Sequence, residues 1–349
     1  MANLRPLARV GLVYSQQTAT FYGGDRASAR VEDHTLGFYQ ALVEARVPFE
    51  MVHDRLLDRE RLEPFRLLIL PNIACLSDRQ CDELRAFVRA GGGLIATFET
   101  SLYDEWGTLR TDFGLAELFG ARPTGPAEGP MHNSYLRLQH GSANGRGHPL
   151  LAGLEDALRI INGVWRVPVA PAAPLAAAPL TLIPSYPDLP MEMVYPRGER
   201  SDLPQVFLHE IGRGRVVYFP WDIDRTFWDV SSMDHGRLLA NAIEWAANEE
   251  RRVSVSGPGL LDVTVWRQKA SMTVHLVNLT NPMMMKGPVR ELVPVGEQRV
   301  RVRLPERETV SRVHLLVADR TPRTDTPAGD LDVTVPSIAD REVIAIDFR

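Results

Sequence analysis

The stretch that decides the fold is RLLILPNIACLSDRQCDELRAFVRAGGGLIATFET, residues 66–100. Arg66–Pro71 is almost wholly apolar, which is typical of a parallel strand covered on both faces. A helix is predicted over Ser77–Ala90, because its Ser-x-x-Gln start fits a capping box and its apolar residues recur with helical spacing. The glycines Gly91–Gly93 end this helix, and Leu94–Phe98 forms the next strand. This order of strand, helix and strand predicts a right-handed crossover within a parallel sheet.

The same alternation continues on both sides of this stretch. Upstream, the short run Arg9–Ser15 and the segment Pro48–His53 are predicted strands, with a helix over Ala29–Arg46 between them. Downstream, Arg215–Pro220 is a predicted buried strand and His235–Ala247 a predicted helix. The fold class is therefore α/β, a flavodoxin-like doubly wound parallel sheet with helices on both faces.

The pattern of apolar residues in the sequence changes after Glu249–Arg252. Helical spacing ends, and short alternating stretches separated by turn residues indicate a small antiparallel β-sandwich. These stretches are Leu261–Trp266, Met272–Leu279, Val300–Leu304, Val310–Val317, Leu331–Val335 and Glu342–Phe348. We therefore divide the chain into an α/β domain, residues 1–250, and a C-terminal β-sandwich domain, residues 251–349.

The segment Val167–Pro204 is rich in proline and alanine and has two interpretations. It is either a disordered linker or an ordered meander of edge strands. We favour the meander, because it has apolar anchors in Trp165, Leu182, Ile183, Met193 and Val194.

Composition excludes several classes of function. The 349 residues carry a formal net charge of −5 and no basic patch, so neither nucleic acid nor an anionic membrane is expected as a partner. The sequence shows no secretion signal, no apolar run of membrane-spanning length and only two cysteines, which predicts a soluble, cytoplasmic protein without disulfides. His132, His140 and His148 lack the cysteine or carboxylate partners of a zinc site. We expect no metal and no cofactor.

Cys75 follows the third predicted strand, where class I glutamine amidotransferases place their nucleophile. That chemistry needs a sharp G-x-C-x-G turn, which exposes the sulfur at a helix N-terminus. Here the turn reads Asn72-Ile73-Ala74-Cys75-Leu76-Ser77, without either glycine, and no His-x-Glu pattern follows late in the domain. The favoured interpretation of Cys75 is a semi-buried, inert thiol.

Polar and aromatic residues follow several strands of the predicted sheet and are expected to meet at its carboxyl edge. Aromatic faces and carboxylates together are what a sugar-binding surface uses. The candidate substrate-binding residues are Gln16, Tyr22, Asn72, Glu99, Tyr103, Trp106, Trp221, Asp222, Asp224 and Trp228. Glu99, Asp222 and Asp224, with Cys75, are also the catalytic candidates, since carboxylates about 5–9 Å apart can hydrolyse glycosides. The favoured alternative is that these residues cap strands and fill an interface.

Residues 8–248 resemble the middle, trimerisation domain of family 42 β-galactosidases and its glutamine-amidotransferase-like relatives. The resemblance rests on the stretch Arg66–Thr100, on HPLLAGL at His148–Leu154 and on GRGRVVYFPWDIDRTF at Gly212–Phe227. VHLVNLT at Val274–Thr280 and the closing EVIAIDF look like the small β-sandwich that ends such glycosidases. The resemblance implies a non-catalytic, trimer-forming domain, because in that family the catalytic glutamates belong to a preceding β/α barrel. No position of this chain corresponds to them.

Three functions follow as hypotheses. The preferred one is a non-catalytic oligomerisation or accessory module of a β-galactosidase-like glycoside hydrolase, contributing sugar contacts; its partners would be further copies of itself or a β/α-barrel glycosidase domain. The second is a self-contained carbohydrate-active hydrolase that uses the strand-end carboxylates. The third is an amidase-type enzyme that depends on Cys75.

Overall fold

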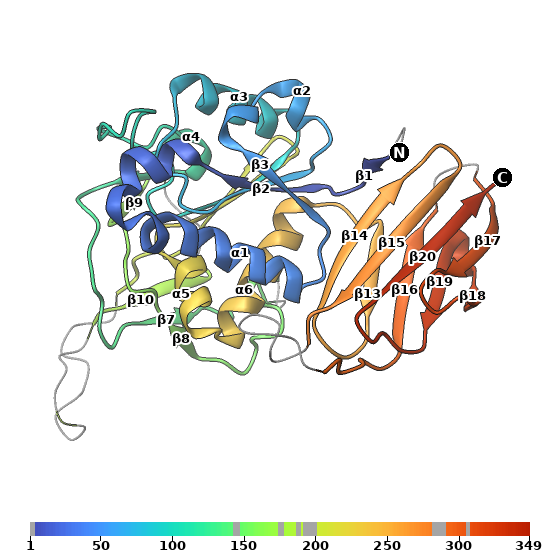
Figure 1. Cartoon of the computed structure of the whole chain (residues 1–349). Coiled ribbons are helices and arrows are strands. Elements are labelled where there is room, and N and C mark those ends of the chain that lie inside the picture. Colours follow the sequence, from blue (N-terminus) through green and yellow to red (C-terminus); the bar gives the residue numbers. More distant parts are fainter. Residues whose placement is uncertain are drawn as a thin grey trace. The chain divides into compact units, whose positions relative to one another are not determined.

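The computed structural model describes residues 4–141, 147–173, 178–185, 190, 201–280, 291–304 and 308–349 (Figure 1). The chain divides into two compact units. The α/β unit consists of Val10–Ala41 and Met51–Asn248, and the β unit consists of Met1–Arg9, Leu42–Glu50 and Glu249–Arg349. The division predicted from the sequence placed the N-terminal residues in the first domain, whereas strand β1 (Arg5–Pro6) pairs with a strand of the β unit.

A six-stranded sheet with the order β11-β12-β5-β4-β2-β3 forms the centre of the α/β unit. Its strands are β2 (Val10–Tyr14), β3 (Phe49–His53), β4 (Leu67–Leu70), β5 (Gly93–Thr97), β11 (Phe207–Ile211) and β12 (Gly214–Phe219). The pairs β2–β4, β4–β5 and β5–β12 are parallel, and β11 runs antiparallel to β12. All side chains of β4 are buried, as the apolar run in the sequence predicted.

Helices cover both faces of this sheet (Figure 1). α1 (Asp33–Glu44), α5 (Ile223–Val230) and α6 (Met233–Ala247) lie on one side, and α2 (Arg59–Leu62) and α3 (Asp78–Arg89) lie on the other. α4 (Ala116–Phe119) shares a core with α3. The capping box predicted at the start of α3 is confirmed, because Ser77 and Gln80 each accept the other's backbone N–H.

The helix predicted over Ala29–Arg46 is regular only from Asp33 to Glu44. Before it the chain forms a π-helical turn at Thr18–Gly23, a 3₁₀ turn at Gly24–Arg26 and a second π-helical turn at Ser28–Glu32. π-helical turns are rare and are found frequently at functional sites. Within α1, a Cβ on Gly37 would lie 1.9 Å from the carbonyl oxygen of Asp224, so this glycine permits the close approach of α1 and α5.

Two small antiparallel sheets complete the α/β unit. One has the order β10-β7-β8, and the other joins β6 to β9. Their strands are β6 (Ala121–Pro123), β7 (Tyr135–Leu138), β8 (Arg159–Ile161), β9 (Val169–Pro171) and β10 (Leu180–Ile183). β9 and β10 lie within the proline-rich segment, so its described part consists of short strands, as the meander interpretation predicts. Met193 and Val194, two of its expected anchors, lie outside the described residues.

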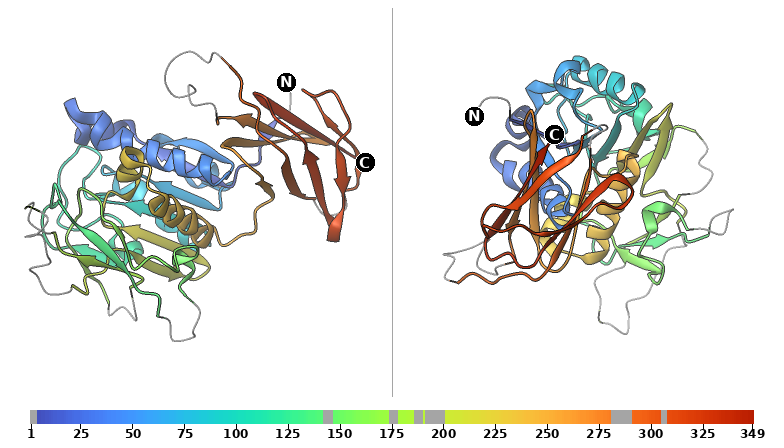
Figure 2. Two further views of the ribbon diagram at one scale, coloured as in Figure 1. Left: turned by 90° about the horizontal axis from the view of Figure 1, so that it is seen from below. Right: turned by 90° about the vertical axis from the view of Figure 1, so that its right-hand side faces the viewer.

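The β unit consists of two antiparallel sheets, with the orders β1-β14-β15-β20-β17 and β13-β16-β19-β18. Its strands besides β1 are β13 (Val253–Ser256), β14 (Leu261–Arg267), β15 (Ser271–Asn278), β16 (Gln298–Arg303), β17 (Val310–Leu315), β18 (Arg323–Asp325), β19 (Asp330–Val335) and β20 (Arg341–Phe348). Figure 2 shows the strands of this unit from two further sides. Buried side chains alternate along β14 and β15, and the inward residues of both sheets form one core. The alternating stretches predicted from the sequence are confirmed as strands.

The described part of the chain contains no helix that combines the length and the apolar character needed to cross a membrane. From the pairing of its strands, the fold class is mixed α/β. The central sheet has both parallel and antiparallel pairs, and the strands of the smaller sheets pair antiparallel.

Candidate functional site

A cavity of about 360 Å³ lies where β5 and β12 end, at the carboxyl edge of the central sheet. Ligands of open α/β sheets bind at this edge. The lining comes from the irregular turns before α1, from α1 itself, from the residues after β5 and β12, and from the loop around Trp165. Its members are Tyr22, Arg26, Ala29, Arg30, His34, Phe98, Glu99, Ala127, Trp165, Asp222 and Arg225.

Glu99 lies in the sharp turn after β5, where Phe98 and Ser101 adopt left-handed φ values of 50° and 63°. The Tyr22 hydroxyl donates to Glu99 Oε2, and the Tyr103 hydroxyl donates to Oε1 at 3.4 Å. Glu99 is only 6% exposed, and this burial raises the pKa of its carboxyl. Burial and the neighbouring Glu99 charge also raise the pKa of Tyr22, and they bring the pKa of Tyr103 to about 12. The two phenols therefore remain hydrogen-bond donors to Glu99 at neutral pH.

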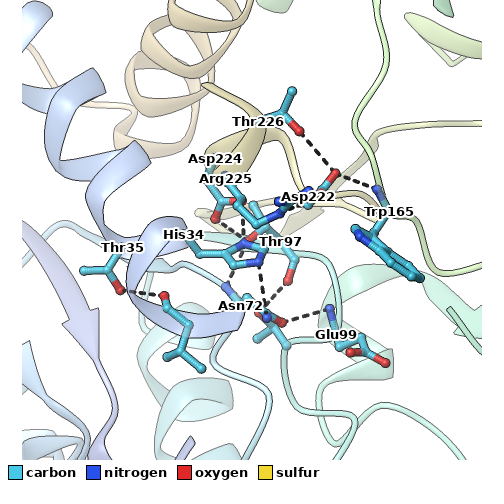
Figure 3. Close-up of polar contacts among 12 residues, drawn as sticks. His34, Thr35, Asn72, Thr97, Glu99, Trp165, Asp222, Asp224, Arg225 and Thr226 are labelled. Atoms are coloured by element: carbon cyan, nitrogen blue, oxygen red, sulfur yellow. Dashed lines mark hydrogen bonds and ion pairs between the residues drawn. The ribbon is translucent and has the colours of Figure 1, made fainter. Parts of the chain in front are cut away.

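Asp222 precedes α5 and is fully buried. Its Oδ2 accepts two hydrogen bonds from the Arg225 guanidinium, at 2.9 Å from Nε and 2.5 Å from Nη2. Its Oδ1 accepts the backbone N–H of Trp165 at 3.0 Å and the Thr226 hydroxyl at 3.3 Å (Figure 3). Both oxygens are therefore occupied by internal donors, which leaves Asp222 poorly suited to serve as a catalytic acid or base.

Asp224 is also fully buried and forms the end of a polar network. Its Oδ1 lies 2.8 Å from His34 Nδ1, and its Oδ2 accepts the Thr97 hydroxyl at 2.7 Å. The other ring nitrogen of His34, Nε2, lies 3.5 Å from the Asn72 amide nitrogen, which can only donate (Figure 3). Nε2 is therefore the acceptor, and Nδ1 carries the proton that is donated to Asp224. This network fixes α1 and α5 against the ends of β4 and β5.

Asn72 is held in the same network and adopts a left-handed φ of 44°. Its side-chain amide donates to the Arg30 carbonyl at 2.9 Å, and its Oδ1 accepts the Glu99 N–H at 3.2 Å. Asn72 is fully buried, so the structure gives it a positioning role beneath the cavity.

Cys75 is fully buried, and burial raises the pKa of its thiol to about 12, with a further contribution from Asp104. Its backbone N–H donates to the Thr18 hydroxyl at 3.1 Å, and its carbonyl accepts the Gln17 side chain at 2.8 Å. An inaccessible thiol with a raised pKa is the opposite of an activated nucleophile.

The remaining candidates do not line the cavity. Gln16 is exposed. Trp106 is 69% exposed and meets Phe21 edge to face, with ring centroids 5.6 Å apart. Trp221 is fully buried and donates its indole N–H to the Gln205 carbonyl at 2.9 Å, as a core residue does. Trp228, on α5, is half-buried away from the lining.

Sequence reasoning missed Arg30, His34, Trp165 and Arg225 as lining residues. Arg225 lies within the strand-end stretch that drew attention to Asp222, so a search for a counter-ion could have found it. Arg30 and His34 gave no such signal, because their position depends on the irregular turns before α1. Among the described residues, no group of three or more His, Cys, Asp or Glu side chains could hold a metal ion.

Residues 8–124 match the family model of the β-galactosidase trimerisation domain. The resemblance to that domain of family 42 β-galactosidases is thereby confirmed. A comparison with curated proteins found no match.

Several solved structures share the fold of the whole chain. α-L-Fucosidase isoenzyme 2 from Paenibacillus thiaminolyticus has a TM-score of 0.72 and 18% identity, covering 100% of this chain and 50% of that one. A family 42 β-galactosidase from G. stearothermophilus has a TM-score of 0.61 and 16% identity, covering 99% and 41%. The β-galactosidase from Bacillus circulans sp. alkalophilus has a TM-score of 0.62 and 14% identity, covering 99% and 42%. At these identities the likeness concerns the fold alone, and this chain spans half or less of each of these proteins.

Proposed function

We propose that this chain is a non-catalytic, oligomer-forming module of a β-galactosidase-like glycoside hydrolase. The observation that carries the proposal is that the acids at the strand ends are hydrogen-bonded within the protein. Both carboxylate oxygens of Asp222 and of Asp224 accept hydrogen bonds from internal donors, and Cys75 is fully buried. An edge built in this way holds helices in place rather than transferring protons, and the match of residues 8–124 to a trimerisation domain supports the same role.

Within this proposal we assign the α/β unit to the flavodoxin-like, class I glutamine-amidotransferase-like sheets. The sheet order is β3-β2-β4-β5-β12-β11; without the antiparallel edge strand β11, the other five strands, numbered along the chain, have the flavodoxin-like order 2-1-3-4-5. The two antiparallel sheets that share one core support the assignment of residues 251–349 to a C-terminal β-sandwich.

The partners in this proposal are further copies of the chain and a β/α-barrel glycosidase domain. The solved β-galactosidases extend well beyond the part that this chain matches, which leaves room for such a barrel. For contact between copies we propose the patch formed by Phe21 and Trp106, which are 46% and 69% exposed and whose rings meet edge to face. Large aromatic and aliphatic side chains that lie together on a surface mark contact sites more often than isolated ones do.

The test is the molar mass of the purified chain in solution. Light scattering after size-exclusion chromatography should give a trimer for the wild type and a shift toward monomer for Trp106→Ala. Leu158→Ala, at an exposed leucine outside the patch, is the matched control and should leave the molar mass unchanged. A wild-type monomer at micromolar concentration contradicts the proposal.

A second candidate is a self-contained carbohydrate-active hydrolase, and one observation favours it: Glu99 and Asp222 line the same cavity. Turnover of a panel of nitrophenyl glycosides, compared with the Glu99→Ala/Asp222→Ala double variant, separates the two functions. Activity that disappears in the double variant establishes the hydrolase and removes the accessory role.

A further inference from the structure

The three arginines in the lining of the cavity differ in their ion pairs. Arg225 is paired with Asp222 and Asp229. In contrast, Arg26 and Arg30 line the cavity but form no ion pair with any of the residues that the structure describes. Arg30 is near enough to Glu99 for its charge to favour the ionised carboxylate. Both come from the irregular turns before α1 and line the same cavity. Two guanidinium groups among the residues that line one cavity favour an anionic ligand.

Arg30 is already held in place for such a ligand. Its guanidinium carbon lies 4.0 Å from the centre of the Tyr22 ring, and the Tyr22 hydroxyl is fixed by Glu99. Stacking on an aromatic ring uses the flat face of the guanidinium and leaves its N–H edge free for two hydrogen bonds to a carboxylate. The Arg30 backbone is fixed as well, because its carbonyl accepts the amide of the buried Asn72.

The rest of the lining fits a sugar ring. Trp165 and Phe98 contribute aromatic surface, on which the C–H face of a pyranose can pack. The Glu99 carboxyl accepts one phenol on each oxygen and keeps acceptor capacity for a ring hydroxyl. The volume of about 360 Å³ lies in the range of small-molecule sites, about 300–1,000 Å³.

The acids in the lining set the charge of the ligand. Arg225 pairs with Asp222, so the charges of the lining that remain are Arg26, Arg30 and Glu99. With Glu99 ionised they sum to one positive charge, which a single carboxylate neutralises and a phosphate dianion exceeds. A carboxylate on a sugar therefore fits better than a phosphate. A neutral sugar would leave the positive charge of the lining without a counter-charge.

We propose that this cavity binds a uronic acid, with the sugar carboxylate on Arg30 and Arg26 and the ring against Trp165. The inference goes beyond the proposed function, because the lining comes from the α/β unit of a single chain and requires neither a second copy nor a barrel domain.

The test is binding of galacturonate, galactose and galactose 6-phosphate to the full chain, measured by calorimetry and by saturation-transfer NMR at constant ionic strength. Galacturonate and galactose differ only at C6, so their comparison isolates the carboxylate. We expect galacturonate to bind at least 10-fold more tightly than galactose, which corresponds to about 1.4 kcal/mol, and also more tightly than the phosphate. Equal affinities, no detectable binding or a preference for the phosphate overturns the proposal.

Matched variants locate the site. Arg30→Gln keeps much of the side-chain length and removes the charge, and it should weaken galacturonate at least 10-fold while leaving galactose unchanged. Arg79→Gln removes an exposed arginine of α3 that does not line the cavity, and it should bind like the wild type. Circular dichroism melting of each variant separates loss of the site from loss of the fold. A folded Arg30→Gln protein with full affinity for galacturonate places the carboxylate elsewhere and overturns the proposal. The molar mass of the chain is measured independently, so failure of this inference leaves the oligomer-forming role to its own test.

Discussion

Replacing Asp224 with asparagine tests whether the acids at the sheet edge hold the fold together. The change keeps the shape of the side chain and replaces one acceptor oxygen with an amide group that can only donate. Asp224 now accepts from His34 Nδ1 at 2.8 Å, from the Thr97 hydroxyl at 2.7 Å and from the Arg225 backbone N–H at 3.0 Å. Whichever way the new amide turns, its nitrogen meets at least one of these donors.

The cost can be worked out for each orientation. An amide nitrogen in the Oδ1 position faces the Nδ1 proton of His34, and a shift of that proton to Nε2 would create the same conflict with Asn72. An amide nitrogen in the Oδ2 position leaves the Thr97 hydroxyl proton without its acceptor. A buried polar group left without a partner costs about 1–3 kcal/mol, and the remaining bonds lose the assistance of the charge. The expected loss of unfolding free energy is therefore about 3 kcal/mol.

The assay is urea unfolding at pH 7 and fixed protein concentration, supported by thermal melting, where about 3 kcal/mol corresponds to about 6–12 °C for a unit of this size. Asp229→Asn is the matched control, because Asp229 is 49% exposed and has one weak contact to Arg225 at 3.4 Å. It should change stability by no more than about 0.5 kcal/mol. If Asp224→Asn loses no more stability than Asp229→Asn, the edge does not depend on this network, and the argument for a structural rather than a catalytic role fails.

Three further predictions concern other parts of the α/β unit. Cys75 should react with iodoacetamide at pH 7.5 only after denaturation, because it is fully buried and its pKa is raised to about 12; rapid labelling of the native protein would instead support the amidase hypothesis. The pKa of Glu99 is raised above its ordinary value of 4.5, so the stability contributed by the protonated carboxyl is complete below pH 4.5 and is lost as the pH rises through the raised value. The melting temperature of Glu99→Gln relative to the wild type should therefore increase between pH 4.5 and 8, and a difference that stays constant or decreases refutes the assignment. Gly37→Ala should destabilise the protein by about 1–3 kcal/mol in urea unfolding, because its Cβ would lie 1.9 Å from the Asp224 carbonyl oxygen; a gain of up to about 1 kcal/mol, as helix propensity alone predicts, contradicts the close approach.

Local signals in the sequence were sufficient for much of the fold. The capping box of Ser77 and Gln80 and the glycines after α3 act within a few residues, so they could be read without knowing the tertiary structure. The alternation in β14, β15, β16, β19 and β20 was equally local, since one face of each of these strands packs into the core. In contrast, β18 (Arg323–Asp325) is fully exposed and lacks an alternating pattern, and β1 has only two residues and contains a proline. Both were therefore missed.

The candidate site was predicted less completely, because burial at a strand end depends on distant parts of the chain. Trp106 and Trp221 both follow strands in stretches of similar composition, yet one is 69% exposed and the other is fully buried. Only the packing of the segments around Gln205 and His235 decides this difference. Arg30 was missed for a related reason, since the π-helical turns shift the angular position of each residue away from the regular helical spacing of 3.6 residues per turn.

The charged groups at the carboxyl edge of the sheet are better suited to binding a ligand than to catalysis. Proton transfer needs a carboxyl group whose oxygens are free to reach the substrate, but Asp222 and Asp224 are committed to Arg225, His34 and backbone donors. Binding needs only groups that face the cavity with unused donors or acceptors, and Arg30 meets that condition. A chain that holds galacturonate without turning over any nitrophenyl glycoside would therefore satisfy the geometry. Turnover that depends on both Glu99 and Asp222 would require Asp222 to release Arg225 when the substrate binds. In that case the Arg225→Gln variant, in which Asp222 is already released, would be less stable but more active than the wild type.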